Sequence, residues 1–437
     1  MKRRSFPGGT HPPQHKSATA DTPSEICPLP PELVIPLAQH VGAPAVACVN
    51  AGQRVGRGQV VGKPNGFVSV PVHASTSGLV VAVESRPHPC GAELPAVILQ
   101  PDGDDVWAEE YLTQSFHVLT TETMLERIRE AGVVGMGGAA FPTHVKLDPP
   151  HGKTIDTAIV NAVECEPWVT ADRRVLLEQR DKVLTGLEVL QKISGARQMW
   201  IGLEDNQTDV AALLAPHCKQ RGVGIAIMPA KYPQGAERQI IYAITGRRVP
   251  TRGLPMDVGV LVQNVGTVAA LTDAVTRARP LIERMVTISG PDVARPRNLR
   301  VRIGTPVAHL LKHCGLREEA AKVLLGGPMM GTAQHTLAVP VLRGTSGVLA
   351  FRRQDITAPA VGSCLRCGRC VAACPMHLLP TFIADYARRD ALDLAERFAA
   401  RNCIECGSCS FVCPAGIPLV QSIRYAKGAI LARRRST

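Results

Sequence analysis

Residues 364–375 read CLRCGRCVAACP, and residues 403–414 read CIECGSCSFVCP. Both stretches have four cysteines with the spacing C-x2-C-x2-C-x3-C, and in both a proline follows the fourth cysteine directly. They hold eight of the fourteen cysteines of this 437-residue chain. In a cytosolic chain, such a dense group of cysteines indicates metal ligands rather than disulfides.

The spacing favours two 4Fe–4S clusters over structural zinc, because zinc sites usually use C-x2-C pairs separated by a longer loop. In two-cluster proteins the fourth cysteine of each run ligates the other cluster. We also expect each C-P step to begin a short helix that directs this fourth thiolate. The predicted ligands of one cluster are Cys364, Cys367, Cys370 and Cys413. The predicted ligands of the other are Cys403, Cys406, Cys409 and Cys374.

Upstream of the cysteines the hydrophobic pattern changes several times. Short β-type runs broken by glycines fill the region before residue 115, and from about residue 120 to 280 strands alternate with helices, which predicts a parallel sheet. The stretch VHASTSGLV at residues 72–80 resembles half of a biotinyl/lipoyl-type barrel-sandwich hybrid. It lacks the usual lysine motif at the hairpin tip, which favours a structural or docking module.

The predicted fold is therefore multidomain α/β. Its expected parts are an extended lead-in (1–30), a barrel-sandwich hybrid (31–115), a Rossmann-like α/β domain (116–282), a β-grasp domain (283–350) and a helical two-cluster ferredoxin-like domain with a basic C-terminal helix (351–437). In the α/β domain we expect strands over residues 155–160, 199–203 and 224–228, and helices over residues 121–131, 175–193 and 208–219.

Two stretches of the α/β domain are unusual. Residues 134–147 read VGMGGAAFPTHVKL, in which glycine N–H groups and one lysine suit an anion, although a tight turn explains the glycines equally well. A predicted helix precedes this loop, so it is not a Rossmann fingerprint. Residues 161–167 read NAVECEP and follow a predicted strand, where ligands bind in α/β sheets.

These two stretches, with residues 232–237 and 264–267, resemble the flavin-binding motifs of the NADH-binding flavoprotein subunit of respiratory complex I. A longer resemblance, to the C subunits of Rnf/Rsx ion-translocating electron transport complexes, runs nearly end to end. It includes FPGGTHPP at residues 6–13, GGPMMG at residues 326–331, both cysteine runs and IPLVQ at residues 417–421.

The resemblance implies that the α/β domain binds FMN, that NADH is the substrate and that the β-grasp domain is SLBB-like. Residues expected to hold the flavin and its phosphate are Gly135, Gly137, Gly138 and Lys146. Those expected to bond the ribityl chain or the ring edge are Asn161 and Glu164. Those expected to line the NADH side are Phe141, Glu166 and Glu237. A further flavin-contacting stretch contains Asn264 and Thr267.

Four residues depart from the complex I pattern. Met136 stands where that subunit has arginine, Val163 replaces an aspartate, and Ala236 replaces one of two adjacent glutamates. Cys165 replaces a serine. The nucleotide contacts of complex I therefore transfer to this chain only in part.

By the same resemblance, the chain is expected to be a peripheral NADH-oxidising subunit of a membrane-bound ion-translocating complex. It would pass electrons from NADH through FMN and the two clusters to membrane subunits, with ferredoxin as a further candidate partner. The cofactors carry the chemistry, so no catalytic side chain is predicted.

Three alternatives stay open. The nearest is a soluble flavin/iron–sulfur NADH-dependent reductase such as a microcompartment cobalamin reductase, in which the barrel-sandwich piece follows the flavin domain instead of preceding it. A scaffold that only carries clusters is the second. The third, a zinc-stapled nucleic-acid-binding protein, would need aromatic residues interleaved with basic ones. Aromatic residues make up only 4% of the chain, so no nucleic-acid partner is expected.

The net charge is +12, which suits anionic lipid or an acidic protein partner but also a surface without a specific partner. Arg3 and Arg4 are not followed by the apolar segment of an export signal, and no stretch is apolar enough to span a bilayer. The expected location is the cytoplasmic face of the bacterial inner membrane, held there by partners.

Overall fold

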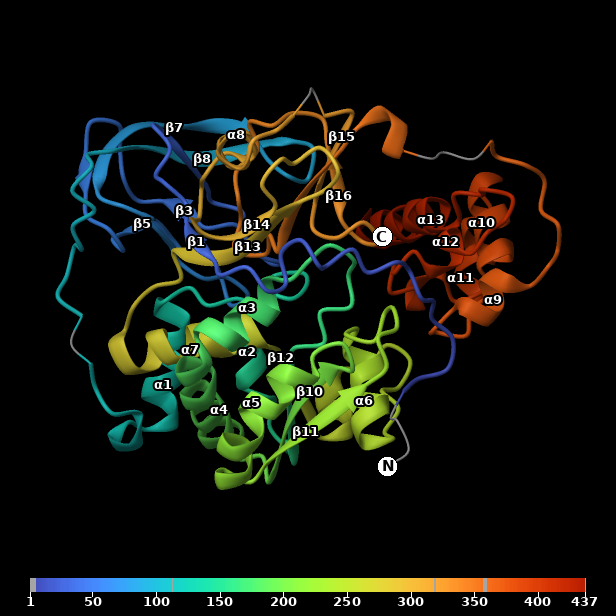
Figure 1. Ribbon diagram of the computed structural model, residues 1–437, viewed down its shortest axis with the longest axis horizontal. Helices are drawn as coiled ribbons and strands as arrows, with labels where there is room; N and C mark the ends of the chain where they lie inside the picture. The colour runs from blue at the N-terminus through green and yellow to red at the C-terminus, as the bar shows by residue number, and fades with distance from the viewer. Residues whose placement is uncertain (1–4, 112, 318–319, 357–359, 437) are drawn as a thin grey trace.

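The computed structural model describes residues 5–111, 113–317, 320–356 and 360–436. Figure 1 shows the barrel-sandwich strands in blue, the α/β domain in green below them, the β-grasp sheet in yellow and orange, and the cluster-bearing helices in red to one side. Within the described residues, no helix is long and apolar enough to cross a membrane.

The α/β domain is built on a four-stranded parallel sheet. Its strands, in spatial order, are β11 (Val223–Met228), β10 (Gln198–Glu204), β9 (Thr157–Asn161) and β12 (Val260–Asn264). The strands are rich in buried Val, Ile, Leu and Met, as expected of a parallel sheet covered by helices. Its helices are α1 (Thr121–Glu130), α2 (Thr143–Leu147), α3 (Ala171–Glu178), α4 (Arg180–Ser194), α5 (Thr208–Gln220), α6 (Glu237–Thr245) and α7 (Val265–Arg277).

The strand order creates a switch point between β9 and β12. After β9 the chain moves to β10 and β11 on one side, and it then returns to the other side of β9 as β12. Open α/β sheets bind ligands in the crevice beyond the carboxyl ends of the strands at such a point. Asn161 and Asn264 end the two strands and are register partners, so both lie at this crevice.

The expected helices and strands of this domain are confirmed, with one difference. Residues 175–193 were predicted as a single helix, but the structure has α3 and α4, separated at Gln179. Helix α3 begins at Ala171, and a carboxylate from the preceding loop binds its first free N–H groups: Glu164 accepts from the backbone N–H of Asp172 and of Arg173. A cap supplied from outside the helix leaves no local signal in the sequence.

The barrel-sandwich part has two antiparallel sheets that enclose a small aliphatic core. The four-stranded sheet has the order β2 (Leu33–Pro36), β8 (Glu93–Pro101), β7 (Gly78–Pro87) and β4 (Arg54–Val55). The three-stranded sheet consists of β3 (Val46–Ala47), β5 (Val60–Lys63) and β6 (Val72–His73). Leu33, Val61 and Leu99 are fully buried between the sheets.

The β-grasp part is a six-stranded sheet with one helix, α8 (Val307–Cys314). Its order is β1 (Glu25–Ile26), β14 (Arg297–Arg302), β13 (Glu283–Ser289), β17 (Gly347–Phe351), β15 (Lys322–Leu325) and β16 (Thr332–Gln334). Strand β1 belongs to the lead-in, which we expected to be extended throughout. It pairs in parallel with β14, so the end of the lead-in completes this sheet.

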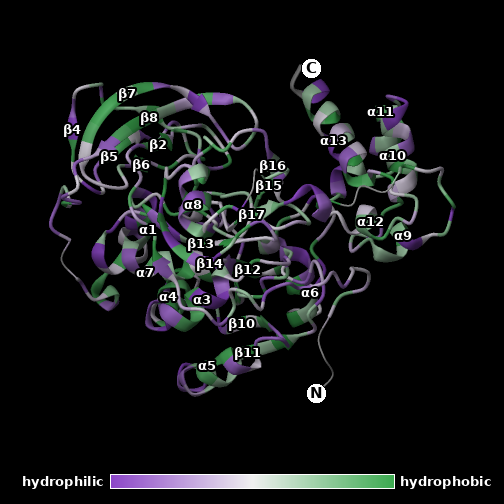
Figure 2. Cartoon of the chain, turned by 45° about the horizontal axis from the view of Figure 1, so that its top comes forward, coloured by the Kyte–Doolittle hydropathy of each residue, from purple (hydrophilic) through white to green (hydrophobic). Residues whose placement is uncertain are grey.

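The cysteine-rich part is helical and stands apart from the rest in Figure 2, where its helices carry both hydrophobic and hydrophilic residues. It contains α9 (Arg369–Ala373), α10 (Pro380–Arg388), α11 (Leu392–Arg397), α12 (Ser408–Phe411) and α13 (Leu419–Ser436). The expectation that each C-P step begins a helix was wrong. Helices α9 and α12 carry the third cysteine of each run and end before the fourth. Gly368 and Gly407 precede these helices as N-cap residues in left-handed conformations.

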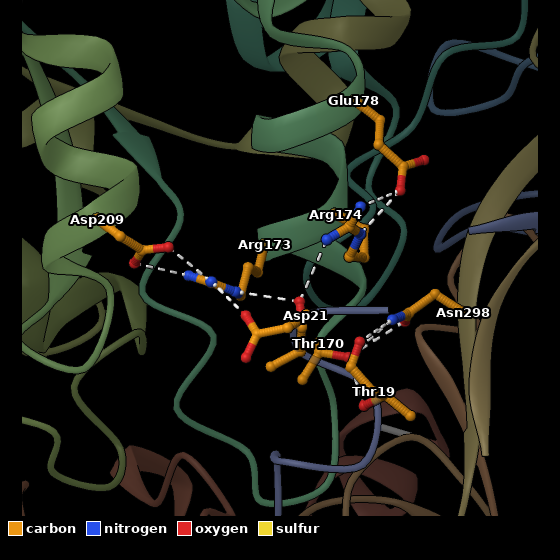
Figure 3. Close-up of polar contacts among 9 residues, drawn as sticks. Thr19, Asp21, Thr170, Arg173, Arg174, Glu178, Asp209 and Asn298 are labelled. Carbon is orange, nitrogen blue, oxygen red and sulfur yellow. Dashed lines mark hydrogen bonds and ion pairs between the residues drawn. The ribbon is translucent and has the colours of Figure 1, made fainter. Parts of the chain in front are cut away.

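The lead-in is fastened along its length, as Figure 3 shows for its middle part. The Asn298 side-chain amide donates to the Thr19 carbonyl at 3.0 Å, and the Thr19 and Thr170 hydroxyls lie 2.7 Å apart. Arg173 binds Asp21 at 2.8 Å on the lead-in side. The lead-in is therefore an integral part of the fold.

Candidate functional site

The glycine loop lies against the start of α7 at the switch-point crevice. The backbone N–H of Met136 donates to the Thr267 hydroxyl at 2.9 Å. A Cβ atom added to Gly137 would lie 2.9 Å from the side-chain nitrogen of Asn264, so the backbone passes too close for any side chain. Three predicted flavin residues, Gly137, Asn264 and Thr267, are thus brought together.

The two asparagines at the strand ends hold neighbouring segments in place. Asn161 donates from its side-chain amide to the Gly235 carbonyl at 2.7 Å. Asn264 donates to the Asp172 carboxylate at 2.7 Å and accepts from the Gly266 N–H at 2.9 Å. Each amide has a fixed orientation, which is what a preorganised crevice requires.

Glu164 occupies a strained turn directly after β9. Its φ of 49° is in the left-handed region, which is uncommon for residues other than glycine. Its carboxylate caps α3, and its backbone oxygen accepts a hydrogen bond from the Lys16 ammonium of the lead-in. Burial and the adjacent Asp172 raise the pKa of the Glu164 carboxyl.

Glu166 connects the crevice to the β-grasp domain. Its carboxylate accepts from the backbone N–H of Met329 at 3.0 Å and of Met330 at 2.9 Å. Gly327 packs on the same side chain, since a Cβ there would lie 2.2 Å from a Glu166 oxygen. Burial raises the pKa of Glu166 to about 7. Its predicted place on the NADH side stays a prediction.

Lys146 and Glu237 reach across the loop from α2 and α6 and form an ion pair of 2.6 Å. Phe141 keeps 37% of its surface exposed, and no protein atom lies within 4 Å of a Cβ built on Gly138. Gly135 is also loosely packed, with its nearest contact at 3.7 Å. Open glycine backbone, an ammonium group and an exposed aromatic ring are donors and surfaces that fit a flat ligand carrying a phosphate.

Two further groups at this site were missed from the sequence. Glu204 ends β10, has no exposed surface, and leaves one carboxylate oxygen without a hydrogen-bond partner. Burial raises its pKa to about 7. Its position at the carboxyl end of a predicted strand was the available signal. Lys16 had no such signal, since it contacts Glu164 across 148 residues of sequence.

The eight cysteines of the two runs line two cavities, each with thiols from both runs. One cavity of about 550 Å³ is lined by Cys364, Cys367, Cys370 and Cys413. A narrower one is lined by Cys374, Cys403, Cys406 and Cys409. Within the described residues, no three His, Cys, Asp or Glu side chains group closely enough to hold a single metal ion.

Two thiols of the narrower cavity accept hydrogen bonds of the kind that iron–sulfur ligands often accept. Backbone N–H groups approach two sulfurs of the narrower cavity: Leu378 donates to Cys374 at 3.4 Å and Glu405 to Cys403 at 3.3 Å. Such bonds set the potential of a bound cluster. Both thiol sets therefore fit a four-thiolate cluster, and their assignment as ligands stays a prediction.

The narrower cavity lies on the side of the switch-point crevice. A Cβ added to Gly407 would lie 2.9 Å from the Met329 carbonyl oxygen, in the same turn that Glu166 binds. The lead-in also touches this region, because the Gly9 N–H donates to the Ala373 carbonyl at 2.8 Å. The two candidate sites are thus joined by direct contacts.

Four family profiles match the chain. They are described as RnfC barrel sandwich hybrid domain (residues 4–104), Nuo51 FMN-binding domain (128–273), SLBB domain (285–333) and 4Fe-4S dicluster domain (363–417). They confirm the predicted fold class and the two kinds of cofactor domain. The boundaries we placed at residues 30, 115, 282 and 350 remain predictions.

Relatives cover nearly the whole chain. It is 46% identical, over 97% of its length and 93% of the relative, to the C subunit of the proton-translocating ferredoxin:NAD(+) oxidoreductase complex of Clostridium ljungdahlii. It is 43% identical, over 100% of its length and 99% of the relative, to the C subunit of the Na(+)-translocating ferredoxin:NAD(+) oxidoreductase complex of Acetobacterium woodii.

A solved NAD+-reducing NiFe-hydrogenase, in its H2-reduced state, shares the fold with a TM-score of 0.53 at 19% identity. This likeness covers 74% of the present chain and 67% of the other.

Proposed function

Because this chain belongs to the family of C subunits of the Rnf ion-translocating ferredoxin:NAD(+) oxidoreductases, we propose that electrons pass through it between NAD(H) and the other subunits of such a complex. The chain carries an FMN-binding domain and a 4Fe-4S dicluster domain. The observation that most supports the proposal is the continuous contact from the glycine-loop crevice through Glu166 and Met329 to the narrower thiol cavity.

When bound, FMN exchanges electron pairs with a nicotinamide and single electrons with the clusters. The chain's own residues position these groups. The open backbone at Gly138 and the Lys146 ammonium would hold the phosphate, and Phe141 would offer a ring for the nucleotide to stack on. Glu237 already pairs with Lys146, so a bound phosphate would share that ammonium or displace the carboxylate.

Cys374, Cys403, Cys406 and Cys409 would hold the cluster nearer to the crevice, because their cavity includes Gly407, which contacts the turn bound by Glu166. The other cavity has an exposed edge where Cys364 and Cys367 reach solvent. Arg366, Arg369 and Arg388 line it, which suits an acidic protein that exchanges electrons, such as ferredoxin or another member of the membrane complex.

We further propose that the chain sits at the cytoplasmic face of the bacterial inner membrane as a peripheral subunit, held by its partners. The names of the two relatives give different coupling ions, a proton and Na+. The electron-carrying role is common to both names, and this is the role we transfer.

Anaerobic purification followed by addition of NADH tests the proposal. We expect a brown-yellow protein whose flavin absorbance bleaches on adding NADH, and which co-purifies with membrane subunits when expressed with them. A colourless protein, or a brown one that lacks flavin and is inert to NADH, would contradict the proposal. A bleaching protein that never associates with membrane subunits would favour a soluble reductase.

A further inference from the structure

The lead-in contacts the loop after β9 at two adjacent points. The His15 ring stacks on the Trp168 ring with centroids 4.5 Å apart. The backbone N–H of Trp168 donates to the Gln14 carbonyl at 2.8 Å. The next residue, Lys16, places its ammonium on the Glu164 carbonyl oxygen. Both Trp168 and Glu164 have positive φ, at 67° and 49°. Residues held in this region cost free energy and persist only when neighbours fix them.

The Lys16 ammonium is also the charge that several buried acids share. Burial raises the pKa of the carboxyls of Glu164, Asp172, Glu166 and Glu204, and in each case the charge of Lys16 opposes that rise. Glu164 and Glu166 lie in the loop after β9. Glu204 ends β10, and Asp172 lies in the first turn of α3.

Other charged groups near these acids do not replace Lys16. Arg284 faces Asp172 alone among the four. The Arg173 guanidinium binds Asp21 and Asp209, at 2.8 and 2.7 Å. The Cys165 thiol, which lies between the two glutamates, has its pKa raised chiefly by burial and adds no positive charge. Among the residues that the structure describes, Lys16 is therefore the cation that acts on all four acids.

We propose that Lys16 is a positioning residue of the flavin site, which holds the Glu164 carbonyl in its left-handed turn and supplies the positive charge shared by the acids at the ends of β9 and β10. The proposal rests on the proposed function, since it assumes that FMN occupies the crevice. Lys16 also lines a cavity of about 370 Å³ with Glu164, Asn206 and Gln207, so its ammonium lies at an opening beside the turn that carries Glu164.

The charge has a defined effect on a bound flavin. Reduction adds negative charge to the site, and a nearby cation stabilises the reduced form. Removal of the ammonium should lower the midpoint potential of the flavin. It should also move the protonation of the buried acids to higher pH, because the charge that opposes the effect of burial at all four acids is then missing.

The test compares three variants of the full, cofactor-loaded protein: Lys16→Gln, Lys16→Arg and Lys153→Gln. Lys153 forms a surface ion pair with Asp257, away from the crevice. Its replacement therefore removes one positive charge without touching the site. Flavin and iron content are measured first. Spectroelectrochemical titrations from pH 6 to pH 9 then give the flavin midpoint potential.

Lys16→Gln should lower the flavin midpoint potential at pH 9, where the acids are ionised in both proteins. It should also raise, by about one unit, the pH at which the slope of potential against pH changes. Lys16→Arg and Lys153→Gln should both keep the midpoint potential and the pH dependence of the unmodified protein. If Lys16→Gln releases its flavin while Lys16→Arg retains it, the positioning role is also supported.

If Lys16→Gln and Lys153→Gln both bind flavin and have the same midpoint potential and the same pH dependence, the inference is overturned. Equal loss of flavin from Lys16→Gln and Lys16→Arg would overturn it too, since it would show that the fold and not the charge was disturbed. Failure of the proposed function looks different, because the unmodified protein itself would then lack flavin or ignore NADH.

Discussion

Gly137 and Gly138 are neighbours in the sequence with opposite surroundings. A Cβ at Gly137 would press on Asn264, whereas a Cβ at Gly138 would meet no protein atom within 4 Å. We expect Gly137→Ala to lower the thermal midpoint of the apoprotein by several degrees, through about 1–3 kcal/mol of overpacking. Gly138→Ala should leave it unchanged. Differential scanning fluorimetry of both apoproteins measures this.

Flavin content then separates two causes. Loss of flavin from Gly138→Ala at unchanged stability would place the ligand directly over that residue. If both variants lost equal stability, the close approach at Asn264 would not be the reason that residue 137 is glycine.

Glu204 makes the stability of the α/β domain depend on pH. Burial raises its pKa from 4.5 to about 7, so the folded protein holds this proton more tightly than the unfolded chain does. The stabilisation is complete below pH 4.5 and is lost as the pH rises through 7. Glu204→Gln should therefore flatten the decline in unfolding free energy over this range by about 1 kcal/mol per pH unit.

Urea unfolding of the apoprotein at several pH values measures this decline. Glu188→Gln serves as the control, because Glu188 is paired with Arg221 near the surface. An unchanged pH dependence in Glu204→Gln would mean that Glu204 is already ionised in the folded protein at neutral pH.

At the scale of elements, the local pattern predicted most of the structure. The strands of the parallel sheet are apolar runs with clear ends, and the amphipathic pattern of α1 and α5 is contained in their own residues. What could not be predicted depends on residues outside the element itself. The start of α3 depends on Glu164, and strand β1 forms only because β14 is available to pair with it.

The same reasoning holds for the site. The thiols that share a cavity follow from spacing that the sequence displays directly. The contact between Glu166 and Met329 joins residues that are 163 positions apart, so it could not be predicted from the sequence around either residue.

Asn298 fastens the lead-in to the β-grasp sheet, and its loss should release that segment. Its buried amide donates to the Thr19 carbonyl and to the Thr170 hydroxyl, at 3.0 and 2.9 Å. Asn298→Ala should cost about 1–3 kcal/mol, because these buried groups lose their partners. Limited trypsin digestion should then cut faster at Lys16, while the exposed Asn50→Ala is cut like the unmodified protein. Equal cutting in both variants would mean that other contacts suffice to hold the lead-in.

For the whole molecule, the shared cavities make a prediction about iron. If each cluster uses thiols from both runs, Cys364→Ser and Cys413→Ser remove the same cluster. Each variant should lose about half of the iron, and the double variant should lose no more than either single one. Cys374→Ser should remove the other cluster, with a different electron paramagnetic resonance signal. Additive iron loss in the Cys364/Cys413 double variant would show that each run binds its own cluster.

The lead-in also constrains the order in which the protein assembles. It is synthesised before the segments that it contacts, because Thr10 pairs with Tyr232, Asn298 binds Thr19, and Gly9 reaches Ala373. Contacts of such large sequence separation close late, because the intervening chain must first be made and ordered. Until residue 373 has been synthesised, the lead-in cannot complete its contacts. During that interval the nascent FMN-binding domain lacks the contact between Lys16 and Glu164, which leaves time for a cofactor to enter before the lead-in docks.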